Sequence, residues 1–211
     1  MKVPETMRRY LQKKMLSMGR GGVRLGALSA VTMSLVSLIL GRSAPDVAPD
    51  GNASSEYQVK AAFLFHFAQF VDWPAEAFKG ADSPLTYCTV GEDPLHGALD
   101  AALSGKTVGA RAFRVQHFKQ AQELQECQVL FVGAEEKKAV LSVLESVRGG
   151  PILTVGEADH FVQDGGMIGF FLDDNKVRFN INLDAAGRAK LKISARLLAL
   201  AKTVIGGPKG T

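Results

Sequence analysis

Between residues 84 and 182, short runs of β-forming residues alternate with segments of helical spacing. The run QVLFVGA at residues 128–134 is apolar after its first residue, which is typical of a strand buried on both faces of a parallel sheet. The predicted strands cover residues 84–91, 111–118, 128–134 and 151–157, and the predicted helices cover residues 93–105 and 135–149. This alternation predicts an α/β layer structure with a mostly parallel sheet flanked by helices.

The last quarter of the sequence departs from this alternation. Two β-rich runs within residues 166–182 flank a turn at residues 173–176, which predicts an antiparallel hairpin at one edge of the sheet. The second half of residues 183–206 has helical spacing and predicts an amphipathic helix. Its apolar positions are Leu197, Leu198, Leu200, Ala201 and Val204. We therefore predict one compact domain over residues 56–206, followed by a flexible tail at residues 207–211.

The front of the chain carries a leader. Residues 25–41 contain no charged residue and are bracketed by Arg24 and Arg42. A basic lead-in before an apolar stretch of this length predicts a secretory signal over residues 1–44, cleaved between Ala44 and Ser55. An uncleaved membrane anchor is the competing interpretation. The Pro-, Ala-, Asp- and Ser-rich residues 45–55 are then a linker.

The distribution of charge separates the leader from the rest. Residues 1–44 hold eight Lys and Arg and one acidic residue, whereas residues 45–211 hold 17 basic and 20 acidic residues. The basic character of the whole chain therefore comes from the leader. A nucleic-acid-binding domain would be basic itself, so we expect no nucleic-acid partner.

The stretch EYQVKAAFLFHFAQFVDWP, residues 56–74, predicts an aromatic-rich helix that Ser54 or Ser55 caps and Pro74 ends. Apolar residues lie on nearly every side of it, and a helix of that kind is either enclosed or shares a second face with a partner. We expect it to serve both the core and an interface.

The chain has two cysteines, Cys88 and Cys127. In an oxidising compartment an even pair favours a disulfide. The alternative is two buried free thiols, because cysteine packs well as a small apolar residue.

A search for catalytic patterns gives little. Gly91, Gly133 and Gly156 each follow a predicted strand without a dinucleotide or phosphate-binding motif, and we interpret them as turn glycines. The four histidines, His66, His96, His117 and His160, lack metal-ligand spacing, and His66 fits a packed or hydrogen-bonded helix position. Asp173 and Asp174 suit a turn, and no nucleophile elbow is present. We expect no enzyme, no cofactor and no metal site.

Four blocks in order carry a resemblance to a known family. They are residues 56–74, YCTVG at residues 87–91, CQVLFVG at residues 127–133, and residues 165–201, which begin GGMIGFFLDDNKVRF. These blocks closely resemble the YfiR-like family of periplasmic proteins, over about residues 56–204.

The resemblance implies a compact α/β fold and a regulatory task in the periplasm. The best understood member is a periplasmic repressor that holds the periplasmic domain of a membrane-bound diguanylate cyclase inactive, which lowers cyclic-di-GMP and biofilm formation. Cys88 and Cys127 match a disulfide of that family. Some members carry a second cysteine pair near Phe161–Met167, and this sequence has none there.

The implied partner is therefore the periplasmic domain of a membrane-bound signalling protein, a diguanylate cyclase in the first place. A homodimer is compatible with this prediction, and the chain would touch the membrane only through an uncleaved leader. The alternative is a periplasmic binding module for a small ligand or another envelope protein, with no cyclase partner. Fold transfers between relatives more safely than function does.

Overall fold

An eight-stranded sheet forms the centre of the protein, in the order β10-β8-β7-β6-β5-β2-β4-β3. The structure is a computed structural model and describes residues 51–90, 95, 97–119, 124, 126–133 and 137–207, with side chains from Ser55 onward. Its strands are β2 (Leu85–Val90), β3 (Thr107–Val108), β4 (Arg111–Phe118), β5 (Val129–Val132), β6 (Leu153–Gly156), β7 (Ile168–Asp173), β8 (Lys176–Asn182) and β10 (Thr203–Ile205). Strands β4, β2, β5, β6 and β7 run parallel, which confirms the predicted fold class.

The predicted hairpin is present but lies one strand inside the edge. Strands β7 and β8 pair antiparallel from Ile168↔Ile181 to Asp173↔Lys176. Their turn residues Asp174 and Asn175 have φ values of 51° and 55°, a left-handed conformation that short polar side chains tolerate best. Strand β10 pairs parallel with β8 on the outer side and forms the edge instead.

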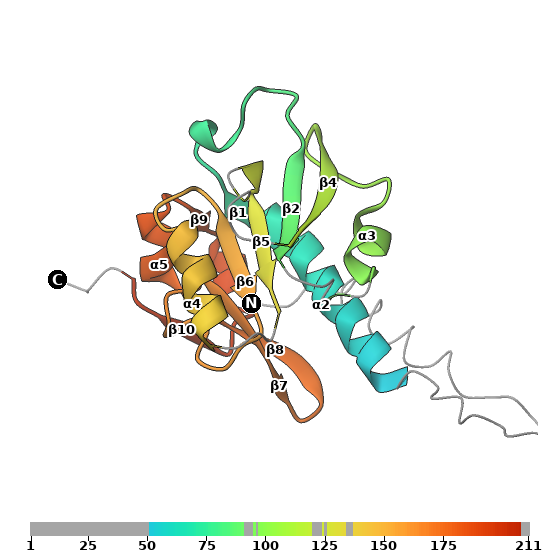
Figure 1. Cartoon of the computed structure of the whole chain (residues 1–211), viewed down its shortest axis with the longest axis vertical. Helices are drawn as coiled ribbons and strands as arrows, with labels where there is room; N and C mark the ends of the chain where they lie inside the picture. The colour runs from blue at the N-terminus through green and yellow to red at the C-terminus, as the bar shows by residue number, and fades with distance from the viewer. Residues whose placement is uncertain are drawn as a thin grey trace, which may run out of the picture. The chain divides into compact units, whose positions relative to one another are not determined.

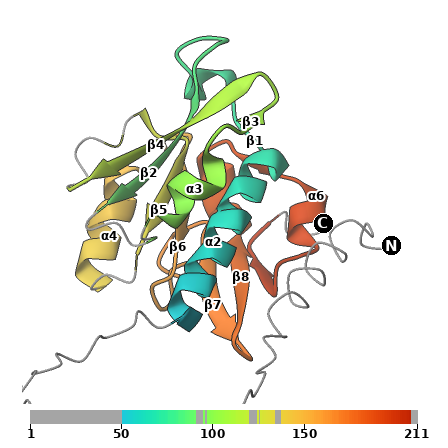
Figure 2. The ribbon, with the colours of Figure 1, turned by 90° about the vertical axis from the view of Figure 1, so that its right-hand side faces the viewer.

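Helices cover both faces of the sheet (Figures 1 and 2). The helices are α2 (Gly51–Phe70), α3 (Ala98–Leu103), α4 (Lys137–Ser146), α5 (Leu183–Arg188) and α6 (Ala195–Leu198). Helices α2, α3, α5 and α6 pack in one apolar core with the sheet, and α4 packs in a second core on the opposite face. We call these the α2 face and the α4 face.

Side chains of the central strands alternate between the two cores. In β5, Val129 and Phe131 point to the α2 face, whereas Leu130 and Val132 point to the α4 face. A central strand covered on both sides needs apolar residues at every position, which explains its uninterrupted apolar run. In β2, Tyr87 lies in the α2-face core, and its hydroxyl donates to the carbonyl of Leu64 at 2.8 Å, which fastens α2 to the sheet.

The end of the chain corrects one prediction. The predicted amphipathic helix in the second half of residues 183–206 is wrong: only α6 is helical there, and β10 follows it. Before α6, β9 (Lys192–Ile193) pairs antiparallel with β1 (Val71–Asp72) in a separate two-stranded sheet. Pairing with β8 and β1 supplies hydrogen bonds that the local spacing could not reveal.

Helix starts also differ from the predictions. Helix α2 begins at Gly51, inside the predicted linker, so Ser54 and Ser55 lie within the helix and do not cap it. It ends at Phe70, before the short 3-10 helix η1 (Ala75–Ala77). Helix α3 begins at Ala98, with Gly97 at its cap in a left-handed conformation, later than the predicted start. Asp93, the first residue of the predicted helix, lies outside the described residues.

One of the predicted turn glycines has a different role. Gly156 is the last residue of β6, and the ring of Phe161 packs directly on it, so a Cβ there would overlap the ring. The same ring would overlap a Cβ at Gly166. These two glycines therefore admit Phe161 into the α4-face core by close approach.

Candidate functional site

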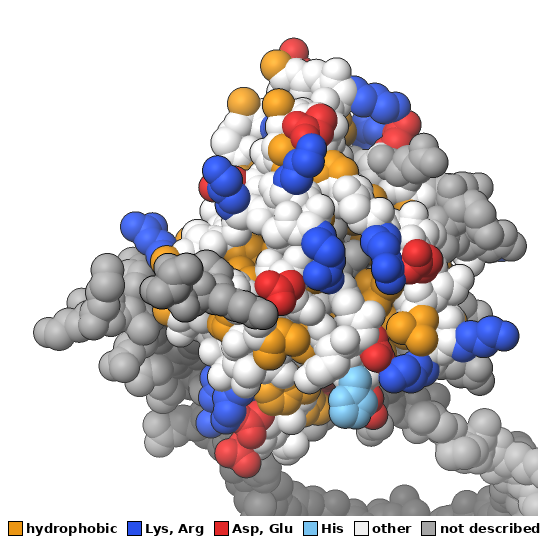
Figure 3. Space-filling model, turned by 90° about the vertical axis from the view of Figure 1, so that its left-hand side faces the viewer, with side chains coloured by type: hydrophobic (Ala, Val, Ile, Leu, Met, Phe, Trp, Pro, Cys, Tyr) orange, Lys and Arg blue, Asp and Glu red, His pale blue; other side chains and the backbone are white. Residues whose placement is uncertain are grey.

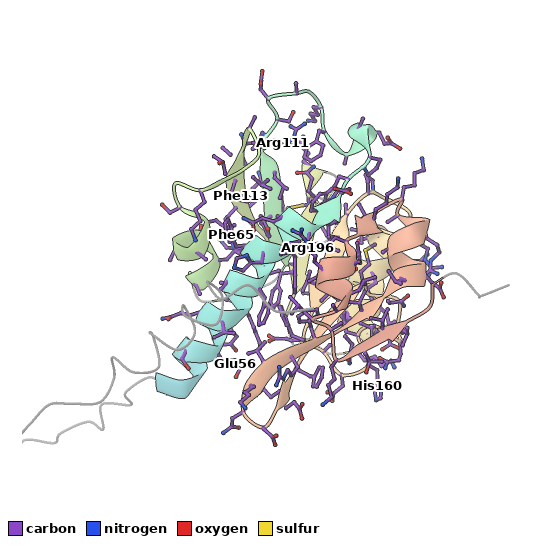
Figure 4. All side chains as sticks on the ribbon, turned by 180° about the vertical axis from the view of Figure 1, so that it is seen from behind. Glu56, Phe65, Arg111, Phe113, His160 and Arg196 are labelled. Atoms are coloured by element: carbon purple, nitrogen blue, oxygen red, sulfur yellow. A yellow bond between two sulfur atoms is a disulfide. The ribbon has the colours of Figure 1, made fainter. Side chains whose placement is uncertain are left out.

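A hollow of about 520 Å³ lies where the N-terminal half of α2 meets the loop after β6 and the β7–β8 hairpin. Figure 4 shows Glu56 near the start of α2 and His160 on the loop, on either side of the hairpin. Strand β6 ends at Gly156, opposite Gly169 of β7, so β7 continues past its neighbour along this hollow. We call it the α2–β7 hollow.

A buried ion cluster forms one wall of the α2–β7 hollow. Lys60 is only 5% exposed, and its ammonium donates to Glu56 at 2.5 Å and to Glu157. It also lies 5.1 Å from the centre of the Tyr57 ring. Burial by itself would lower the pKa of Lys60, but the hydrogen bonds and charges of the two carboxylates outweigh it and raise the pKa above its usual range.

Only part of this cluster leaves a local signal in the sequence. Glu56 and Lys60 are spaced i,i+4 on a helix, which predicts a surface ion pair. Glu157 joins them because β6 ends beside α2, and a residue 97 positions away cannot be anticipated from local spacing. Two carboxylates on one buried ammonium leave an excess of negative charge.

Cys88 and Cys127 form a disulfide, with their Cα atoms 5.8 Å apart. Cys88 lies within β2 and Cys127 just before β5, so the bond joins two neighbouring strands. Both residues are buried in the α4-face core. The structure thus follows the disulfide interpretation and not that of two free thiols. The bond closes a loop with a sequence separation of 39 residues, which includes α3 and β4.

The described histidines lie apart from one another. His66 Nδ1 is 3.3 Å from Gln69 Oε1 on the same helix, in line with a hydrogen-bonded helix position. His160 lies on the loop beside the α2–β7 hollow, and His96 lies outside the described residues. Within the described part of the chain, no group of three or more His, Cys, Asp or Glu side chains could hold a metal ion.

His117 belongs to a chain of three polar side chains that the sequence did not reveal. Its Nδ1 lies 2.7 Å from Thr89 Oγ1, and its Nε2 lies 3.4 Å from Asp100 Oδ2. The order of hydroxyl, imidazole and carboxylate resembles a catalytic triad. Thr89 is fully buried, however, so its hydroxyl cannot reach a substrate. The chain ties α3 to β2 and β4.

Asp173 and Asp174 occupy the hairpin turn region, as predicted. Asp173 accepts a hydrogen bond from Lys202 at 3.0 Å, and this bond is the main cause that lowers the pKa of Asp173. The pair therefore links the hairpin to the segment before β10.

The exposed side of α2 carries fewer large apolar side chains than the sequence suggested. Its exposed described side chains are Ser55, Gln58, Val59, Ala62 and Gln69. Among these, only Val59 is large and apolar, with 43% of its surface exposed. The core role of α2 is confirmed by its buried residues Leu64, Phe67 and Ala68. An interface role for this outer stripe stays a prediction.

Two further hollows have different linings. One, of about 660 Å³, lies between α5, β9 and α6, and the other, of about 490 Å³, lies between α3 and β4. Neither is lined by a buried charged side chain. In the view of Figure 3, charges of both signs are spread over the described surface, and hydrophobic side chains show in small groups. No helix among the described residues combines the length and apolarity needed to cross a membrane.

A solved structure shares the fold. A conserved domain protein from Vibrio cholerae O1 biovar El Tor is similar with a TM-score of 0.50 and 10% sequence identity, over 71% of this chain and 60% of that one. The ABC domain from Streptococcus pneumonia, solved in complex with L-Trp, matches with a TM-score of 0.44 and 10% identity, over 73% of this chain and 60% of that one. This chain thus spans 60% of the length of each. At this identity the first match shows the fold alone.

Comparison with protein families gives a more specific result. The match, described as YfiR/HmsC-like, covers residues 57–202, which is more than half of the chain. It contains the aromatic helix, both cysteines and the hairpin. The chain belongs to the YfiR/HmsC-like family.

Proposed function

We propose that this protein represses a membrane-bound diguanylate cyclase by contact with the periplasmic domain of the cyclase, and so lowers cyclic-di-GMP and biofilm formation. The family match over residues 57–202 carries this proposal. The leader at residues 1–44 would export the protein, and its cleavage would release the domain into the periplasm.

The protein acts through binding and has no catalytic turnover of its own. The arrangement that most resembles catalytic machinery, Thr89 with His117 and Asp100, supports this view because the Thr89 hydroxyl is enclosed. A nucleophile must reach the substrate to attack it. The side chains of this group instead connect secondary structure elements.

Deletion of the gene tests the proposal in cells. Cyclic-di-GMP and surface attachment should both rise, because an unrestrained cyclase produces more of the messenger. The full chain should restore the original levels when it is supplied from a plasmid. A chain that starts at residue 45 lacks the export signal and serves as the control, which should fail to restore them. Unchanged cyclic-di-GMP in the deletion strain, with its cyclases expressed, would contradict the proposal.

The α2–β7 hollow favours a second candidate function. Its volume of about 520 Å³ lies within the range of small-molecule sites, roughly 300–1,000 Å³. The protein would then be a periplasmic binding module for a small ligand, with no cyclase partner. The deletion strain separates the two functions, since a pure ligand-binding module leaves cyclic-di-GMP unchanged.

A further inference from the structure

The α2–β7 hollow combines an enclosed wall of charge with an open apolar rim. The buried wall contains Lys60, which is 5% exposed. The Lys60 ammonium lies between the carboxylates of Glu56 and Glu157. The Glu157 side chain is itself only 11% exposed. Because these charged side chains are enclosed, they cannot rotate into solvent, and they determine which ligand charge the hollow favours.

The charges that line the hollow do not balance. Glu56, Glu157 and Asp159 supply three carboxylates, against the single ammonium of Lys60, and Tyr57 and His160 are the other titratable residues of the lining. The Lys60 ammonium is already occupied by two carboxylates, so it has little capacity to bind an anion. The excess negative charge favours a ligand that brings a positive charge and N–H donors.

Apolar side chains and one unpaired hydrogen-bond acceptor also line the hollow. Leu172 is 53% exposed at the rim, and Phe171 and the Tyr57 ring also border the hollow. Asn180, another lining residue, has a buried Oδ1 with no hydrogen-bond donor among the described residues. An aromatic or aliphatic body would cover Leu172 and Phe171, and aromatic faces attract cations as well.

From this combination we propose that the α2–β7 hollow is a binding site for a small organic cation, namely a primary amine that carries an apolar body. The ammonium group lies toward Glu157 and Asp159, and the apolar body covers Leu172 and Phe171. A ligand carboxylate is disfavoured by the same excess of negative charge. The inference rests on the second candidate function and names the ligand class of the same hollow, but it is independent of the proposed repression, because binding of the amine needs no cyclase.

Three probes of similar shape and different charge test the proposal. The full-length protein is titrated with 2-phenylethylamine, 2-phenylethanol and 3-phenylpropionate, and binding is followed by calorimetry and by the thermal midpoint. The amine should bind saturably and raise the midpoint, and added salt should weaken it. Equal binding of the alcohol would show a merely apolar hollow and overturn the proposal. Binding of the carboxylate in preference to the amine, or no binding of the amine, would overturn it too.

Substitutions then place the amine in this hollow. Glu157→Gln should weaken amine binding by about tenfold, since it removes a negative charge from an enclosed position, and Asp159→Asn should weaken it by a smaller factor of about threefold, because Asp159 is exposed to solvent. Asp159→Asn leaves the partners of Lys60 intact, so it remains informative even if Glu157→Gln destabilises the fold. Asp82→Asn, on the exposed loop between η1 and β2, is the matched control and should bind as the wild type does. Amine binding unchanged in both hollow variants would overturn the assignment.

Discussion

On the α2 face of the sheet, the rings of Phe63, Phe67, Phe170 and Phe179 lie with centroid distances between 5.2 and 6.0 Å. On the α4 face, a smaller core surrounds the disulfide Cys88–Cys127. The α2-face core combines this aromatic group with aliphatic side chains, whereas the α4-face core combines mainly aliphatic packing with a covalent bond. A single helix of ten residues, α4, covers this second face, and the disulfide stabilises the face in addition to its packing.

The largest expected effect lies on the α2 face. Phe67 is fully buried and packs against both Phe170 and Phe179. Phe67→Ala should lower the free energy of unfolding by about 3–5 kcal/mol, because a cavity remains where the ring was. Urea unfolding measures this, with Val59→Ala on the exposed side of the same helix as the control. A loss no larger than that of the control would show that the aromatic group does not dominate the stability of this face.

The disulfide gives the corresponding test on the α4 face. Cys88→Ser or Cys127→Ser should cost about 2–5 kcal/mol, since the unfolded chain regains the freedom of the loop and a hydroxyl is buried. The double change Cys88→Ala with Cys127→Ala separates loss of the bond from burial of the hydroxyl. Thermal melts of these variants, with thiol labelling of the denatured, unreduced protein, provide the measurement. Two labelled thiols per wild-type chain, or variants that melt with the wild type, would refute the role of the bond.

A smaller effect is expected at Gln128, at the start of β5 and between the two cores. Its Oε1 accepts from the Thr86 N–H at 2.8 Å, and its Nε2 donates to the Ala77 carbonyl at 2.7 Å. Gln128→Leu should cost about 1–3 kcal/mol, because both backbone groups lose their partner. Urea unfolding compares it with Phe67→Ala. A cost as large as that of Phe67→Ala would mean that this polar link matters as much as the aromatic core.

The smallest expected change in stability concerns Lys60, and it is expected only at high pH. The pKa of Lys60 in the folded state lies above its ordinary value of 10.5, so its contribution to stability is complete below pH 10.5 and is lost as the pH rises through the folded-state pKa. Wild-type protein should therefore lose stability at alkaline pH more steeply than Lys60→Met does. Urea unfolding across that pH range compares them. Parallel pH profiles would show that the cluster is not coupled to folding.

The sequence predicted the parts of the fold that local pattern determines. The central strands follow from apolar runs, and the limits of β4 agree with the predicted residues 111–118. Leu197, Leu200 and Val204 have helical spacing, so a helix was wrongly predicted over the α6–β10 segment. Val204 instead lies in β10, because it pairs with Ile181 of β8. Tertiary hydrogen bonds override a short apolar pattern of this kind.

The candidate site was less accessible to sequence analysis. The disulfide could be expected from two cysteines in a chain with a predicted export signal, since the count leaves one pairing. The cluster of Lys60 with Glu56 and Glu157 depends on the sheet order, which brings the end of β6 beside α2. The unpaired Oδ1 of Asn180 likewise depends on its surroundings in the folded chain. The contribution of Glu157 to the cluster and the unpaired Oδ1 of Asn180 therefore leave no local signal in the sequence.

Binding of this protein to the periplasmic domain of a cyclase, with both components purified, tests the proposed repression by direct contact. Deletion of this gene should raise cyclic-di-GMP, and deletion of the target cyclase in the same strain should cancel that rise. The periplasmic domain of the cyclase identified in this way is the partner for the binding experiment. Calorimetric titration of that domain with the oxidised protein should give saturable binding, and variants that lack the disulfide should bind less because fewer molecules are folded. Absence of binding between two folded, oxidised components would contradict repression by contact.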